Sequence, residues 1–160
     1  MIALNILDIK KFMSLFLGGT LFDEYSLVEA QITTFCTFSI DGRYEALFED
    51  APPGETSYVR WSKLKEHCFS IIRGKKTPLF FKFVFFYPEE ELPKLLGSLD
   101  TSLGISEVKG LCLNLRYDGT NLVLTTGTSL KVFSMDRSAD RAWDDYVRRL
   151  LMERDILISE

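Results

Sequence analysis

The sequence predicts an α+β domain with an antiparallel-rich sheet and a C-terminal helix. Short segments rich in Val, Ile, Thr and Phe are typical of strands. Two of them adjoin Asp-Gly dipeptides, which favour tight hairpin turns because both central residues need a positive φ. Apolar residues recur at helical spacing in three other segments, at about 9–17, 62–73 and 138–152.

The first predicted unit begins with a strand and a helix. Residues 1–7 are mainly apolar and predict the strand. The carboxylate of Asp8 can accept hydrogen bonds from the first amides of a helix that runs to about Leu17. The dipeptide Gly18-Gly19 is expected to end this helix in the left-handed conformation.

Three strands are predicted after this helix. Residues 25–40 are too many for one flat strand, and we expect a break near Thr33-Thr34. Asp41-Gly42 is the predicted turn of a hairpin whose return strand covers residues 43–48.

The same order returns after a Pro-rich loop. A short strand at 57–61, a helix capped by Ser62 that extends to Arg73, and an apolar strand at 78–87 follow one another. This order predicts a duplicated strand-helix-three-strand unit, with pseudo-repeats over 1–56 and 57–133 in a single domain of residues 1–160.

The remaining elements are a short helix, further strands and the final helix. The predicted segments are an acidic helix at 89–96, a hairpin of 108–117 and 121–126 around Asp118-Gly119, and a strand at 129–133. Ser138 is expected to cap a helix to about residue 152, which buries one apolar face, made of Trp143, Val147, Leu150 and Leu151.

No motif predicts an enzyme. The chain has no glycine-rich dinucleotide fingerprint and no Gly-x-Ser-x-Gly elbow. His67 and Cys68 are adjacent on a helix and point about 100° apart, so we expect Cys68 in the core and His67 at the polar edge. The three cysteines are unevenly spaced, which favours reduced thiols over a disulfide framework or a zinc site. We expect no catalytic residue, metal or cofactor.

A carboxylate site built from distant elements stays an open alternative. That alternative is a hydrolase, and no pair of residues is singled out for it. A separate alternative is an acidic metal face on the last helix, for which Asp140 and Asp144, four residues apart, are the pair to test, although charges there are ordinary for a solvated helix face.

A cytoplasmic protein without a membrane partner is expected. The longest apolar run, residues 79–87, is broken by Lys82, and a membrane-spanning helix needs about 20 residues. Lys10 and Lys11 follow the apolar amino end, which is the reverse of the order in a secretory signal.

Positive charge is concentrated on the two repeated helices. The net charge is -4, yet the formal charge is +5 over residues 58–77 and -7 over 21–57. The predicted basic face is formed by Lys10, Lys11, Lys63, Arg73, Lys75 and Lys76. Such a face can bind nucleic-acid phosphates, duplex DNA included, without reading bases. Lysines are also common on any solvent-facing helix, so an ordinary surface is the alternative.

The apolar strand at 78–87 suggests a second kind of contact. Both of its faces are apolar, so both must be covered. If helices cover one face only, the other face presents a tentative partner or homo-oligomer interface, formed by Phe80, Lys82, Val84 and Phe86. The alternative function is therefore a protein-interaction or scaffold domain that assembles through its sheet and has no nucleic-acid role.

The element order also resembles one domain of the DNA sliding clamps. The resemblance lies in residues 2–7 leading into 8–17, the Asp41-Gly42 hairpin, and 58–65 leading into the second helix and 78–87. It implies paired helices whose basic face is turned toward duplex DNA, and a ring only through homo-oligomerisation. The insertion at 89–105 and the final helix depart from the clamp pattern.

Two stretches are similar to an uncharacterised family of Clostridia-type Firmicutes. They are residues 28–35 (VEAQITTF) and 129–136 (SLKVFSMD). This likeness implies a bacterial protein of unknown function and supplies no activity and no site residues.

Overall fold

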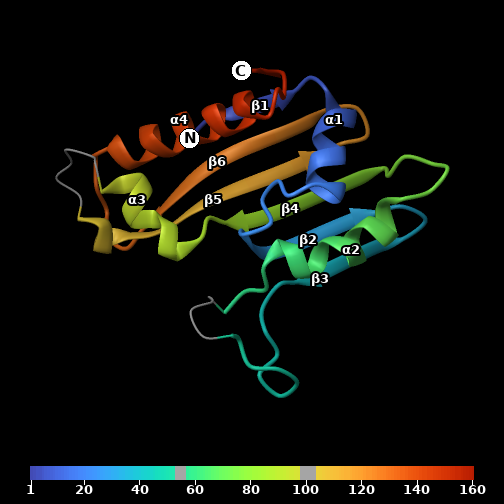
Figure 1. The fold of residues 1–160 in the computed structure, drawn as a ribbon, viewed down its shortest axis with the longest axis horizontal. Helices are drawn as coiled ribbons and strands as arrows, with labels where there is room; N and C mark the ends of the chain where they lie inside the picture. The colour runs from blue at the N-terminus through green and yellow to red at the C-terminus, as the bar shows by residue number, and fades with distance from the viewer. Residues whose placement is uncertain (53–56, 98–103) are drawn as a thin grey trace.

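One antiparallel sheet forms the centre of the protein (Figure 1). The computed structural model describes residues 1–52, 57–97 and 104–160. In this part of the chain, seven strands lie in the order β3-β2-β4-β5-β6-β1-β7, and every paired strand is antiparallel to its neighbour. The strands are β1 (Ala3–Ile6), β2 (Ser26–Thr33), β3 (Thr37–Asp41), β4 (Phe80–Phe86), β5 (Val108–Tyr117), β6 (Leu122–Leu130) and β7 (Ile158–Ser159).

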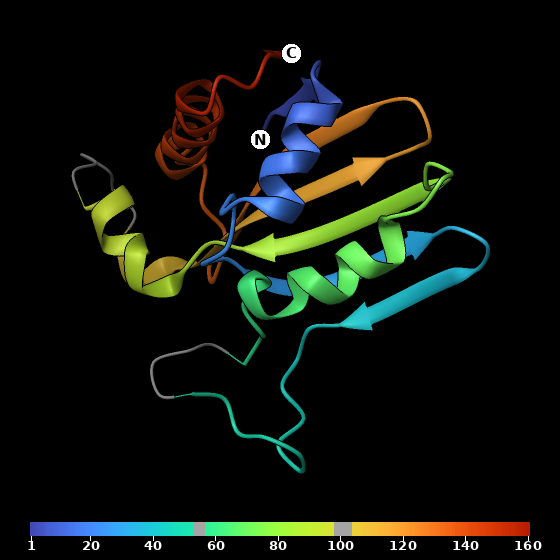
Figure 2. The ribbon, with the colours of Figure 1, turned by 45° about the vertical axis from the view of Figure 1, so that its right-hand side comes forward.

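The main helices cover one face of this sheet. Figures 1 and 2 show α1, α2 and α4 on the same side. The helical elements are α1 (Ile9–Met13), the π-helical turn η1 (Ser14–Gly18), α2 (Trp61–Ile72), η2 (Glu89–Glu91), α3 (Leu92–Leu96), η3 (Ile105–Glu107) and α4 (Ser138–Glu153). The α+β class and the C-terminal helix are therefore confirmed. Among the described residues, no helix combines the length and apolar character that a membrane span requires.

Phenylalanine fills the core between the helices and the sheet. Phe81, Phe83 and Phe85 alternate along β4 and are buried against the helices. The ring of Phe83 lies 5.3 Å from that of Phe16 and 5.4 Å from that of Trp61, both edge-on. Large aromatic rings bury much apolar surface, and this core accounts for part of the 13 phenylalanines of the chain.

The first helix begins as predicted and ends differently. The Asp8 carboxylate accepts a hydrogen bond from Lys11 N at 3.0 Å, which confirms the cap. The expected left-handed stop is wrong, because Gly19 has φ -98°. After Met13 the helix widens into η1, and Gly19 N donates to the carbonyls of Ser14 and Leu15.

The predicted return strand at residues 43–48 is wrong. The β2–β3 hairpin turns at residues 34–36, and the chain passes through Gly42 without reversing. Gly42 N donates to Val28 O, and a Cβ on Gly42 would lie 1.7 Å from Leu27 O. The glycine is needed for this close approach rather than for a hairpin turn. Of the predicted strand, Arg43 alone forms a bridge, to Tyr58.

The second unit keeps its three strands and loses its leading strand. The predicted strand at 57–61 is reduced to isolated bridges at Tyr58 and Arg60. Arg60 occupies the N-cap of α2, so the prediction of Ser62 as the cap is wrong. After α2, the strands β4, β5 and β6 pair in succession. The pseudo-repeat boundaries and the single domain stay predictions.

The later elements largely follow the prediction. The acidic helix forms as η2 and α3, and part of the loop after it lies outside the described residues. The Asp118-Gly119 turn is confirmed, and Gly119 has φ +98°. The strand at 129–133 is wrong as a separate element, because β6 continues to Leu130. Ser138 is the first residue of α4 rather than its cap, and its amide donates to the Asp136 carboxylate at 2.8 Å.

Candidate functional site

Two of the predicted basic residues are engaged within the protein. Lys11 Nζ donates to the carbonyl oxygen of Asp155 at 3.0 Å. Lys63 Nζ lies 3.3 Å from the hydroxyl of Tyr44 and 3.8 Å from Glu49 Oε1. Glu49, in the acidic segment before residue 53, therefore partly neutralises the positive charge of Lys63 at the start of α2. Lys10 is exposed on α1.

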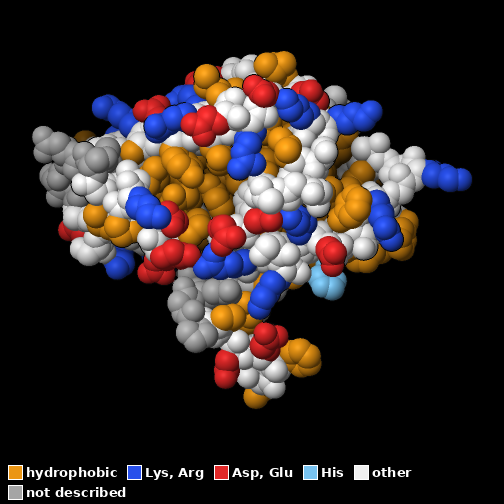
Figure 3. Space-filling model, in the orientation of Figure 1, with side chains coloured by type: hydrophobic (Ala, Val, Ile, Leu, Met, Phe, Trp, Pro, Cys, Tyr) orange, Lys and Arg blue, Asp and Glu red, His pale blue; other side chains and the backbone are white. Residues whose placement is uncertain are grey.

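The other three basic residues lie together around one groove. Arg73, Lys75 and Lys76 are exposed at the end of α2, and they line a cavity of about 770 Å³. Within the described parts of the chain, none of the three has an acidic side chain within ion-pair distance. We call this cavity the basic groove; its other lining residues include Thr34, Phe35, Phe38, Ile71 and Leu79. Figure 3 shows basic and apolar side chains together at this end of α2.

The turn between β2 and β3 forms the apolar wall of the basic groove. Phe35 is 92% exposed, and its ring lies edge-on to that of Phe38 at 5.8 Å. Leu79 N donates to Thr33 O at 3.0 Å, which holds the turn beside the segment that follows α2. The sequence prediction missed Phe35. The predicted break near Thr33-Thr34 is confirmed, because β2 ends at Thr33 and β3 begins at Thr37. An aromatic residue beside this break was the available signal, but the hairpin turn itself is predicted at Asp41-Gly42.

The tentative interface residues lie on the sheet face that no described helix covers. Lys82 Nζ forms an ion pair with Glu29 Oε1 at 2.8 Å. The ring of Phe86 packs edge-on against Tyr58 at 5.8 Å, and the Arg116 guanidinium lies 5.6 Å from the centre of the Phe80 ring. With Val84, these side chains are half-buried. The row is therefore broken by charge and partly covered by its own neighbours.

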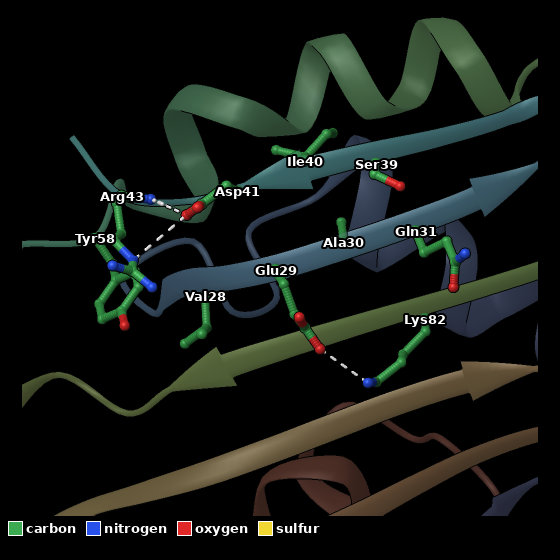
Figure 4. A pocket seen from close by; sticks show the side chains of 10 residues that line it. All are labelled: Val28, Glu29, Ala30, Gln31, Ser39, Ile40, Asp41, Arg43, Tyr58 and Lys82. Atoms are coloured by element: carbon green, nitrogen blue, oxygen red, sulfur yellow. Dashed lines mark hydrogen bonds and ion pairs between the residues drawn. The ribbon is translucent and has the colours of Figure 1, made fainter. Parts of the chain in front are cut away.

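A polar hollow of about 540 Å³ lies on this open face beside β2 and β3. Figure 4 shows Glu29 and Lys82 pointing toward one another, and Arg43 beside Asp41 and Tyr58. Arg43 Nε is 3.8 Å from Asp41 Oδ1. Because its charged groups are paired with one another, the hollow offers an incoming ligand little net charge.

Comparison with known proteins identifies a family. A family model matches residues 15–158 of the chain. The chain belongs to DUF5721, a family of unknown function. The matched range contains both the basic groove and the open sheet face. No curated protein and no solved structure matches this DUF5721 chain. The resemblance to sliding clamps therefore stays a prediction, and so does the restriction of the family to Clostridia-type Firmicutes.

The reactive side chains of this DUF5721 domain are dispersed. Cys68 is fully buried, and burial raises the pKa of its thiol to about 12, whereas His67 is exposed. Asp144 accepts a hydrogen bond from Thr126, and Asp140 pairs with Arg137 at 3.0 Å. Over residues 1–52, 57–97 and 104–160, no group of three or more His, Cys, Asp or Glu side chains is placed to hold a metal ion.

Proposed function

We propose that this DUF5721 domain is a non-enzymatic binding module that contacts nucleic acid, without base specificity, through the basic groove. The observation that supports this proposal is the position of Arg73, Lys75 and Lys76 around one groove, with no acidic partner among the described residues. Cations placed in this way can neutralise backbone phosphates and release their counterions. Phosphate contacts of this kind carry no sequence information.

The apolar wall favours single-stranded over duplex nucleic acid. Phe35 presents an almost fully exposed ring beside the three cations. Proteins that bind single strands combine a basic groove with aromatic rings on which unpaired bases stack. Bases inside a duplex are already stacked on one another, so the Phe35 ring adds affinity only for unpaired bases.

The clamp-like arrangement of the helices is part of the proposal, although the preferred ligand is a single strand and not the duplex DNA that the sliding-clamp resemblance implies. Two features are consistent with it: α1 and α2 lie on the same face of the sheet, and three antiparallel strands follow α2. Lys10, which is exposed on α1, would then extend the contact beyond the basic groove. In this arrangement, a ring would require several copies of the chain.

A salt titration of oligonucleotide binding tests the proposal. The full chain is mixed with a labelled single strand, or with its duplex, and the fluorescence anisotropy is measured at increasing salt. We expect weak binding that falls with a log–log slope of about -0.7 per neutralised phosphate for the single strand. The duplex should bind more weakly. Sequence changes in the oligonucleotide should have little effect.

Two charge-reversal variants test whether binding depends on the basic groove itself or only on the net charge of the protein. Arg73→Glu with Lys75→Glu and Lys76→Glu should abolish binding. The matched control reverses the charge of three exposed basic residues outside the groove, in the variant Lys131→Glu with Arg137→Glu and Arg141→Glu. This control should retain most of the nucleic-acid binding. No binding by the unmodified chain at low ionic strength, or equal losses in the two triple variants, would contradict the proposal.

The open sheet face supports a second candidate function, a protein-interaction or scaffold domain. Phe80, Val84 and Phe86 are half-buried on a face without a covering helix among the described elements, and exposed apolar surface of this kind often marks a partner. Light scattering should then show a stable homodimer that Val84→Arg dissociates and the groove triple variant leaves intact. A monomer at high protein concentration would contradict this homodimer.

A further inference from the structure

Two large apolar side chains project into solvent from the segment between β3 and α2. Figures 1 and 2 show this segment extending away from the sheet. Leu47 is fully exposed, and Phe48 is 91% exposed. Exposed apolar side chains that adjoin one another are typical of interaction sites, whereas isolated ones are ordinary.

Backbone hydrogen bonds give this segment a defined shape. The amides of Phe48 and Glu49 both donate to the carbonyl oxygen of Glu45 at 2.9 Å, which closes one helical turn. At the base of the segment, Tyr44 N donates to Ser57 O at 2.9 Å. An apolar pair that is held in place before binding loses less conformational entropy when it docks.

Carboxylates surround the apolar pair. We call residues 45–50 (EALFED) the acidic turn, because Glu45, Glu49 and Asp50 lie on either side of this pair. Glu49 Oε1 lies 3.8 Å from Lys63 Nζ. Glu45 and Asp50 are exposed, and neither forms an ion pair with a base in the described part of the chain. Figure 3 shows acidic and apolar side chains together on this projection, which therefore offers a partner an apolar anchor with negative charge.

The basic groove has the complementary composition. Arg73, Lys75 and Lys76 supply three positive charges, equal in number to the three carboxylates of the acidic turn. Phe35, which is 92% exposed, and Leu79, which is 66% exposed, supply apolar surface beside them. The cavity of about 770 Å³ has room for both side chains of the apolar pair. Surfaces with complementary charge select one partner over others.

The acidic turn and the basic groove of one chain lie at opposite ends of α2. Lys63, which contacts Glu49 of the acidic turn, is in the first turn of α2, whereas Arg73 directly follows Ile72, its last residue. The 12 residues of α2 span about 18 Å. The acidic turn is therefore out of reach of the groove in its own chain, but it can reach the groove of a second copy.

We infer that the acidic turn of one copy of this chain docks into the basic groove of a second copy. Leu47 and Phe48 of the acidic turn pack against Phe35 and Leu79 of the groove. The carboxylates of the acidic turn pair with the three cations of the groove. The two surfaces differ, so the contact is heterologous and leaves each copy free to bind another. Repeated contacts give a head-to-tail chain of copies or a closed ring.

This contact is weak and depends on salt. A single turn buries less surface than a standard interface of about 1,600 Å², and salt screens the attraction between exposed charges. We therefore expect reversible association at high protein concentration and low ionic strength. The docking does not depend on nucleic-acid binding, but a second copy and a nucleic acid exclude one another because they use the same cations.

Sedimentation velocity of the full chain tests this contact. At low salt, the average sedimentation coefficient should rise with protein concentration, and high salt should return it to the monomer value. Two variants should each lower the association constant at least about tenfold, because a few anchor residues carry most of the binding energy of an interface. The turn variant is Leu47→Ser with Phe48→Ser, and the groove triple variant is Arg73→Glu with Lys75→Glu and Lys76→Glu. A monomer at all concentrations of the unmodified chain would overturn the inference.

Mixing the two variants distinguishes this contact from a symmetric one. Each variant alone lacks one half of the contact and should not associate through it. In the mixture, the intact acidic turn of the groove triple variant meets the intact groove of the turn variant, so a one-to-one complex should form and grow no further. A mixture without this complex, or a variant that self-associates as strongly as the unmodified chain, would overturn the inference.

Matched controls change apolar residues outside the acidic turn and the basic groove. Phe133→Ser with Met135→Ser removes two side chains that are 93% and 85% exposed and should leave the association constant unchanged. Val84→Arg, on the open sheet face, should also leave it unchanged. A loss in either control equal to that in the turn variant would overturn the inference.

The turn variant also distinguishes this docking from the proposed function. It keeps the three cations of the basic groove, so it should bind the labelled single strand as the unmodified chain does. If the unmodified chain binds the strand but never self-associates, only the docking is refuted. If it self-associates but binds no strand, only the nucleic-acid proposal is refuted.

Discussion

The indole ring of Trp61 stacks on the phenyl ring of Phe16, with the ring centroids 4.6 Å apart and the planes inclined by 11°. The same indole donates from Nε1 to the carbonyl oxygen of Phe16 at 3.1 Å. Trp61 is the first residue of α2, and Phe16 lies in η1. One fully buried side chain therefore fixes the two helices to each other above β4.

Replacing this indole should destabilise the whole domain. Trp61→Ala should lower the free energy of unfolding by about 3–5 kcal/mol, because it leaves a large cavity, and urea titration measures the change. Phe69→Ala, on the exposed side of the same helix, is the control and should cost far less. Equal effects of the two variants would show that the Trp61–Phe16 contact has no special role.

Thr126 is expected to contribute more to the free energy of unfolding than its neighbour Thr125. Its hydroxyl accepts from Ile2 N at 2.9 Å and donates to the buried carboxylate of Asp144. Thr126→Val leaves both groups without this partner and should cost about 2 kcal/mol of unfolding free energy. Thr125→Val, on the open face of the same strand, should change it by less than about 0.5 kcal/mol. Thermal unfolding of the two variants compares them directly, and a stable Thr126→Val protein would count against this network.

The ion pair between Lys65 and Asp23 joins α2 to the segment after η1. Lys65 Nζ lies 2.7 Å from Asp23 Oδ1 and 2.7 Å from the Gly19 carbonyl oxygen, and both side chains are less than one-fifth exposed. Lys65→Met leaves a poorly solvated carboxylate and should cost about 3 kcal/mol. Lys94→Met breaks the more exposed pair with Glu91 and should cost less than about 1 kcal/mol.

A double variant isolates the ion pair. Lys65→Met with Asp23→Leu should recover part of the loss, because no unpaired charge then remains. If the two single losses simply add in denaturant titrations, the two residues are not coupled.

The three cysteines should differ in reactivity. Burial raises the pKa of Cys68 from 9.0 to about 12, so at mildly alkaline pH this residue stays a thiol, and the thiolate is the nucleophile. Cys36 is exposed and should react first with Ellman's reagent, in a phase that Cys36→Ser removes. Fast modification of Cys68 in the folded protein would contradict its burial.

The same pKa shift predicts a loss of stability at high pH. The folded state binds the Cys68 proton more tightly than the unfolded state does. This contribution to stability is therefore complete below about pH 9 and is lost as the pH rises toward 12. Denaturant titrations should show a shallower decline over this range in Cys68→Ala than in the unmodified chain.

Local patterns were sufficient where burial alone decides the structure. The alternation of Phe81, Phe83 and Phe85 predicted a core strand, and the helical spacing of Trp143 and Val147 predicted the buried face of α4. Each pattern is contained in one segment, and it therefore required no knowledge of distant partners.

Patterns failed where a distant segment decides the conformation. Asp41-Gly42 has the composition of a hairpin turn, yet the close approach of Gly42 to Leu27 and Val28 keeps the chain extended. Similarly, Arg60 replaces Ser62 at the start of α2, where Trp61 N donates to Tyr25 O.

Only the basic residues of the candidate site could be predicted from the sequence. Arg73, Lys75 and Lys76 were predicted from charge, but their apolar partner Phe35 is brought to them by the pairing of β2 with β4. The contact between the rings of Tyr25 and Tyr87 could not be predicted either, because the two residues come from distant parts of the chain and meet only in the folded protein.

The place of β1 in the sheet constrains the order in which the molecule can assemble during translation. β1 lies between β6 and β7, with Ala3 opposite Thr125 and Asn5 opposite Ser159. β1 therefore leaves the ribosome long before β6 and β7, the two strands with which it pairs. Contacts of such long sequence separation slow folding, and the nascent chain must keep Leu4 and Ile6 from other apolar surfaces until β6 emerges.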